Sequence, residues 1–131
     1  MTIALWCLFI AGLLHILSKV PLFRAQLKSP AGYDNNHPRE QQQALEGSGK
    51  RALAAHLNQI ESFPLFATGV LVASFSGVTS ALVSYLAVAY ILSRIAYLYC
   101  YIKDIAMLRT TVWLIGYASS LALICSPAWG M

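Results

Sequence analysis

The chain has 131 residues, of which 58% are hydrophobic and only 11% are charged, and its mean hydropathy is +0.62. An average soluble domain is about 45–50% apolar and about 25% charged, so this composition excludes the usual soluble globular class. We predict a single domain, residues 1–131, that is an all-α integral membrane protein.

The formal net charge of +4 does not indicate a nucleic-acid-binding protein, because the cations follow the apolar stretches. Residues 1–18 contain no Lys or Arg, the polar segment after them is rich in both, and none follows residue 109. Cations collect on the cytoplasmic side of membrane proteins. We therefore predict that both termini lie outside and that the first and third loops are cytoplasmic.

Four apolar stretches, at about residues 2–18, 62–77, 79–102 and 110–126, are each near the ~20 residues that cross a bilayer core, so we predict a bundle of four membrane-spanning helices. The first is not read as a cleavable signal peptide, because nothing basic precedes it and no small-residue cleavage site ends it. We expect it to remain in the mature protein. The predicted helices cover about residues 2–18, 50–76, 79–102 and 110–126.

The cytoplasmic loop, about residues 21–49, is the only long polar segment. Pro38 is suited to the first position of a short helix over residues 37–45, with Asn36 or His37 as its cap. The GSGK sequence that ends the loop is not a phosphate-binding loop, because Arg51 replaces the required Ser or Thr.

Asp34, His37 and Glu40 have a spacing compatible with a metal ion. A turn rich in Asp, Asn and Pro is more often held by side-chain to backbone hydrogen bonds, and we favour this second interpretation. We predict no metal site.

The helix over residues 50–76 would be about 40 Å long, so it should extend beyond the ~30 Å hydrocarbon layer at its basic end. Pro64 frees the carbonyl of Ile60 and should bend this helix. Rows of small residues at four-residue spacing should let helices approach closely in lipid. These rows are Gly69, Ala73 and Gly77, and Gly116 and Ser120.

Two polar stripes at helical spacing should face each other. Arg51, Asn58 and Glu61, with His56 and Gln59 beside them, lie on the second helix, and Tyr90, Arg94, Tyr97 and Tyr101 lie on the third. A charge at membrane depth costs at least about 2.5–3.5 kcal/mol, so we expect Glu61 and Arg94 to pair, within a subunit or across an interface. A buried ion pair that locks the bundle is the simpler reading, whereas the surplus polarity favours a cavity open to the cytoplasm.

Arg109, followed by two threonines, lies at the N-terminal end of the fourth helix. A helix N-terminus with an arginine favours an anion. The alternative is an ordinary arginine at the membrane interface.

The segments KRALAAHLNQIESFPLF (residues 50–66) and RIAYLYCY (residues 94–101), with the later Arg109, resemble the MAPEG family, the membrane-associated proteins in eicosanoid and glutathione metabolism. The resemblance spans the four-helix pattern. It implies a homotrimer that binds glutathione between neighbouring subunits near the cytoplasmic face.

The resemblance also implies roles for individual residues. Asn58 and Glu61 would hold the polar backbone and amino group of glutathione, Arg94 would brace Glu61, and Arg109 would activate the thiol. The remaining glutathione-binding candidates are Tyr97, Tyr101, Arg24, His56 and Arg51.

This chain departs from the family pattern at three positions. Leu57 and Ala54 stand where family enzymes carry arginines, and Trp113 stands where a tyrosine often follows the catalytic arginine. Arg51, one turn before Ala54, is a candidate replacement for that charge.

Two functions remain open. The first is a glutathione-dependent transferase or peroxidase, in which the thiolate attacks a lipophilic electrophile or hydroperoxide from the bilayer. The second is a non-catalytic lipid-binding or scaffold protein, favoured by Leu57 and Trp113. A transporter fits less well, because no second polar cluster marks an exit. The compact loops suggest a bacterial inner-membrane protein.

Overall fold

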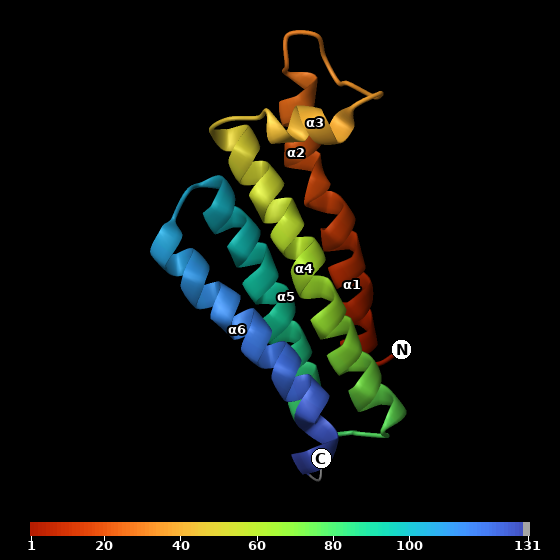
Figure 1. The fold of residues 1–131 in the computed structure, drawn as a ribbon. Coiled ribbons are helices and arrows are strands. Elements are labelled where there is room, and N and C mark those ends of the chain that lie inside the picture. Colours follow the sequence, from red (N-terminus) through yellow and green to blue (C-terminus); the bar gives the residue numbers. More distant parts are fainter. Residues whose placement is uncertain (130–131) are drawn as a thin grey trace.

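The computed structural model describes residues 1–129, and within them the protein is all-helical, with no strand. The predicted all-α class is confirmed. Figure 1 shows α1, α4, α5 and α6 running side by side, with α2 and the short α3 at one end. The elements are α1 (Ile3–Leu17), α2 (Lys19–Leu27), α3 (Pro38–Gln43), α4 (Ser48–Phe75), α5 (Ala81–Ile102), α6 (Ala106–Cys125) and the 3-10 turn η1 (Ser126–Trp129).

The first helix and the first loop differ from the prediction, because α2 continues the helical path to Leu27. Pro21 does not stop it. It lies in the first turn of α2, where a backbone N–H has no partner within the helix. The short helix in the loop is confirmed, since α3 begins with Pro38 at its first position and His37 as its N-cap.

Three stretches of the described chain are long and apolar enough to cross a membrane. The fourth long helix, α4, is not among them, and its first half is polar, with Lys50, Arg51 and Glu61. The membrane character of the protein is therefore supported, whereas a fourth membrane span at α4 stays a prediction. The three stretches are Ile3–Leu27, Ala81–Ile102 and Ala106–Trp129.

Two glycines allow α6 to pack closely on its neighbours. A Cβ added at Gly69 of α4 would lie 2.7 Å from the Cβ of Leu123, and one at Gly116 of α6 would lie 2.8 Å from the Oγ of Ser93. The expected role of the small-residue rows is therefore confirmed at these positions. Gly77 is an exception: its φ of 71° places it in the turn after α4, with no atom near its missing Cβ.

The connections separate to the two ends of the bundle (Figure 1). The start of α1, η1 and the α4–α5 connection lie at one end, and the loop that contains α3 lies at the other end with the α5–α6 connection. A buried core formed by α1, α4, α5 and α6 holds these helices together. The first and third connections thus share one end, as the distribution of cations predicts.

Candidate functional site

Arg94 is the most unusual buried side chain, because it is charged and 0% exposed. It lies on α5 and reaches α4, where two amides receive its guanidinium group. Its Nε donates to Oε1 of Gln59 at 2.9 Å, and its Nη2 donates to Oδ1 of Asn58 at 2.7 Å. Gly116 of α6 packs beside this arginine, since an added Cβ there would be in ordinary van der Waals contact with the Arg94 Cδ, at 3.7 Å.

Aromatic rings connect Arg94 to a second arginine. The guanidinium carbon of Arg94 lies 4.3 Å from the centre of the Tyr97 ring, and the Tyr97 and Tyr101 rings are 5.6 Å apart. The guanidinium carbon of Arg109 lies 4.5 Å from the centre of the Tyr101 ring. Cations are attracted to the faces of aromatic rings at these distances. Asn58, Gln59, Arg94, Tyr97, Tyr101 and Arg109 thus form a continuous series of contacts, which we call the arginine–tyrosine row.

The row runs from the buried interior to the end of the bundle where α5 connects to α6. Arg94 is fully buried, Tyr97 is buried, and Tyr101 and Arg109 are half-buried. Arg109 lies one turn into α6, which begins at Ala106. The structure therefore brings together five of the candidate residues predicted from sequence.

Glu61 does not pair with Arg94 within the described chain, so the intrasubunit form of that prediction is wrong. Among residues 1–129 no carboxylate lies within 4 Å of an arginine or lysine nitrogen, and Glu61 is exposed on α4. The cause is the helix rotation of about 100° per residue. Asn58 and Gln59 face α5, so Glu61, two residues after Gln59, points to about the opposite side from it.

Two buried donors in the row have no acceptor in the described chain. They are Nη1 of Arg94 and Nε2 of Gln59, whose side chains are already joined by a hydrogen bond. An unsatisfied buried donor costs about 1–3 kcal/mol, and more when it is charged. These neighbouring orphan donors mark a place where an additional acceptor would be stabilised.

The other three candidate residues lie outside the row. His56 faces α1, and its Nδ1 is 2.8 Å from Oγ of Ser18. Arg51 is half-buried in the first turn of α4, and its Nε has no partner. Arg24 lines a cavity between α2 and α4. Within one chain, the structure therefore does not bring Arg24, Arg51 or His56 to Arg94 and Arg109.

The sequence places Gln59 beside the polar stripe but not among the glutathione-binding candidates, whereas in the structure it is fully buried and bonds Arg94 directly. The candidates also leave out Ser62, whose hydroxyl lies 2.9 Å from that of Tyr90. Both residues are polar within a helix that packs in the core. Which polar residues of α4 face α5 depends on the rotation of α4 about its axis, and the sequence does not show that rotation.

The loop before α3 has the hydrogen-bonded form favoured from sequence. Oδ1 of Asp34 accepts from the backbone N–H groups of Asn36 at 3.1 Å and His37 at 3.0 Å. The Asp34 carboxylate therefore closes a tight turn, which is a common use of Asp at such positions.

Comparison with known proteins gave one match. The family model described as "MAPEG family" matches residues 3–129. The match covers α1 to η1 and therefore every residue of the arginine–tyrosine row. Comparisons with curated proteins and with solved structures gave no match.

Proposed function

This chain belongs to the MAPEG family, and on that basis we propose that it is a membrane-embedded glutathione transferase or peroxidase acting on lipophilic electrophiles or hydroperoxides. The observation that carries the proposal is the arginine–tyrosine row, in which a buried cation with an orphan donor is linked to a second, half-buried cation. The second cation, Arg109, would act on the thiol.

The residues present fit glutathione, which carries two carboxylates, one ammonium group and a thiol. The orphan donors of Arg94 and Gln59 suit a carboxylate or peptide oxygen. Glu61 lies on the same helix one turn from Asn58, and its exposed carboxylate suits the ammonium group. Polar groups of both signs are therefore available around Asn58, as a zwitterionic peptide requires.

Arg109 is suited to hold the thiolate. A free thiol has a pKa of about 8.5, and each unit by which a nearby cation lowers it corresponds to about 1.4 kcal/mol of thiolate stabilisation. Tyr101, beneath the guanidinium group, restricts where that group can lie. In this proposal Arg109 contacts the sulfur, and Tyr101 positions Arg109.

The thiolate would react in one of two ways. With a carbon electrophile, a carbon–sulfur bond forms while the leaving group departs with its electron pair. With a hydroperoxide, the sulfur attacks the terminal oxygen, the O–O bond breaks and the alcohol leaves after taking a proton. The resulting sulfenic acid then reacts with a second glutathione to give the disulfide and water.

We further propose that the protein is a homotrimer with the site between subunits, and that the end containing α3 and Arg109 faces the cytoplasm of a bacterial cell. The outward faces of its helices support burial against lipid or another subunit. Leu92 and Tyr99 of α5, for example, are 62% and 58% exposed. Glu61 would then lie where a neighbouring subunit or the ligand can reach it.

The proposal is tested with purified protein and a general electrophile. Arg109→Gln should lower kcat/KM for glutathione conjugation roughly 100-fold, the size typical of losing one group that stabilises developing or full negative charge. The matched control is Arg39→Gln, which removes an exposed arginine from α3. Conjugation that is equal in the two variants would refute the role of Arg109.

The second candidate function is a non-catalytic lipid-binding or scaffold protein. It is favoured by Leu57, which is 36% exposed beside Asn58, and by Trp113, whose ring packs at 4.6 Å from that of Tyr117 instead of offering a hydroxyl. Thermal denaturation with glutathione separates the two functions, since a ligand stabilises only the state that binds it. The absence of any shift at millimolar glutathione would favour the second.

A further inference from the structure

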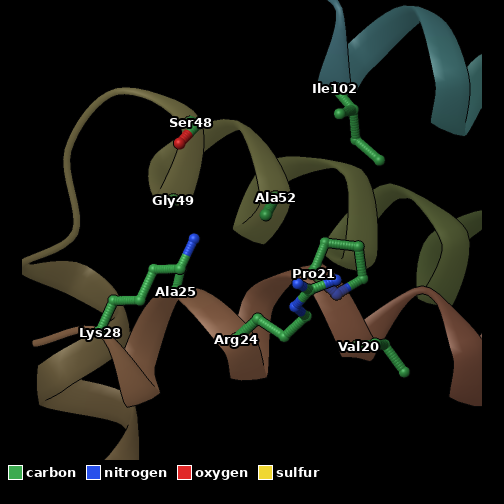
Figure 2. Close-up of a pocket in the computed structure, with 9 residues that line it drawn as sticks. All are labelled: Val20, Pro21, Arg24, Ala25, Lys28, Ser48, Gly49, Ala52 and Ile102. Atoms are coloured by element: carbon green, nitrogen blue, oxygen red, sulfur yellow. The ribbon is translucent and has the colours of Figure 1, made fainter. Parts of the chain in front are cut away.

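A cavity of about 450 Å³ lies between α2 and the first turns of α4, outside the arginine–tyrosine row (Figure 2). Ile102, at the end of α5, lies at its margin. At the point where α2 and α4 touch, a Cβ added at Gly49 would lie 3.2 Å from the Cβ of Ala25, so the two helices are in close contact there. The volume is within the ~300–1,000 Å³ usual for small-molecule sites.

The cavity is cationic. Arg24 of α2 and Lys28, the residue that follows α2, are the ionisable residues among those that line it. Figure 2 shows the Lys28 side chain extending toward α4 and the Arg24 side chain running along α2 toward Pro21. The hydroxyl-bearing side chain of Ser48 lies on the opposite wall. Neither cation makes an ion pair within residues 1–129. Two unpaired cations and a hydroxyl donor favour an anionic oxygen ligand such as a phosphate.

The surroundings of the cavity are apolar. α2 exposes Val20, Phe23 and Leu27 by 40% or more, and Ile102 is 42% exposed. In addition, α2 forms the last turns of the first stretch that is long and apolar enough to cross a membrane, Ile3–Leu27. Basic side chains at the end of a membrane span, beside exposed apolar ones, lie at the level of lipid headgroups.

We propose that this cavity binds the phosphate of an anionic phospholipid. Arg24 and Lys28 contact the phosphate oxygens, Ser48 donates its hydroxyl, and the acyl chains lie against Val20 and Phe23. The proposal rests on placing this end of the bundle at the membrane interface and is independent of the glutathione reaction. It also gives Arg24 a role that differs from the one implied by the family resemblance.

The test uses the full chain in a neutral detergent and measures lipid retention by native mass spectrometry. Wild-type protein should retain phosphatidylglycerol in preference to phosphatidylcholine, and salt should weaken this retention. An Arg24→Gln, Lys28→Gln double variant should bind phosphatidylglycerol roughly 30-fold more weakly, about fivefold for each cation near a headgroup.

The matched control removes the same charge from the same end of the bundle, through Lys50→Gln and Lys103→Gln. Both lysines are exposed, and neither lines the cavity. An equal loss in the control variant would overturn the proposal in favour of general surface charge. Equal retention of the two lipids by wild-type protein, which needs no variant, would also overturn it.

A third arm separates a lipid from a free anion. Thermal denaturation is followed with inorganic phosphate and, separately, with phosphatidylglycerol at equal concentration. Stabilisation by the lipid alone is expected, because only the lipid also covers the apolar face of α2. Equal stabilisation by inorganic phosphate would refute the lipid and leave a simple anion site.

Discussion

Among the glycines, Gly69 is predicted to be the position at which one added methyl group destabilises the bundle most. In Gly69→Ala the new Cβ would lie 2.7 Å from the Cβ of Leu123 and 2.9 Å from the backbone oxygen of Ser120. Neither atom is the far end of a flexible side chain, so α6 itself must shift. Overpacking of this kind costs about 1–3 kcal/mol.

A matched control removes the effect of helix propensity. Alanine is favoured over glycine by about 1 kcal/mol inside a helix, and both Gly69 and Gly12 lie inside helices. In Gly12→Ala the added Cβ meets nothing within 4 Å. The difference between the two variants is therefore the overpacking cost alone, about 1–3 kcal/mol.

The measurement is the apparent melting temperature of both variants in one detergent. Each kcal/mol corresponds to a shift of about 2–8 °C for small domains, so Gly69→Ala should melt clearly below Gly12→Ala. Gly116→Ala should fall between them, because its Cβ meets the side-chain hydroxyl of Ser93, which can rotate. If Gly69→Ala melts at or above Gly12→Ala, the close contact between α4 and α6 is refuted.

Two further predictions concern buried hydrogen bonds. Arg94→Lys keeps the charge, but a lysine cannot reach both amide oxygens that accept from the guanidinium group, so the variant should lose about 1.5–3 kcal/mol of stability. The same melting assay measures this loss, and an unchanged melting temperature would contradict the two hydrogen bonds to the amides. Ser62→Ala leaves the fully buried hydroxyl of Tyr90 without its partner and should cost about 1–3 kcal/mol. Adding Tyr90→Phe should recover part of that loss, and additive losses in the double variant would show that the two hydroxyls do not interact.

The part of the arginine–tyrosine row that lies on α5 could be predicted, together with Tyr90, from spacing on a single helix. Tyr90, Arg94, Tyr97 and Tyr101 recur at four, three and four residues, and three of these four are buried in the structure, with Tyr101 half-buried. Spacing fixes which side chains share one face of a helix, and a face that contains an arginine in an apolar chain must point inward. The interior position of Arg94 can therefore be predicted from the sequence.

The partner of Arg94 could not be read in the same way. Asn58, Gln59 and Glu61 all lie within one turn of α4, and charge alone favours Glu61. Which of them faces α5 depends on how α4 is rotated, and that rotation is set by packing elsewhere, including the contact of Gly69 with α6 and the bond of His56 to Ser18. The choice of amides over the carboxylate is thus decided by tertiary packing.

The path of α2 shows a second limit of sequence patterns. The polar composition of residues 21–49 predicted a loop from residue 21, yet α2 extends to Leu27, because helix formation tolerates a proline such as Pro21 in a first turn. Gln26, fully buried, donates from its Nε2 to the backbone oxygen of Pro38 at 3.2 Å and so holds the loop against α2. This contact spans 12 residues, and nothing in local composition indicates it.

The absence of a carboxylate beside Arg94 bears on function. Amide oxygens satisfy hydrogen-bond donors without neutralising a charge, and Tyr97 offers only a ring face to the guanidinium group. A buried cation is costly when no opposite charge is near. Within residues 1–129 that charge is not supplied, so binding an anion at the orphan Nη1 would recover free energy that one subunit alone leaves unused. In the proposed homotrimer, glutathione or the exposed Glu61 of a neighbouring subunit would supply this negative charge.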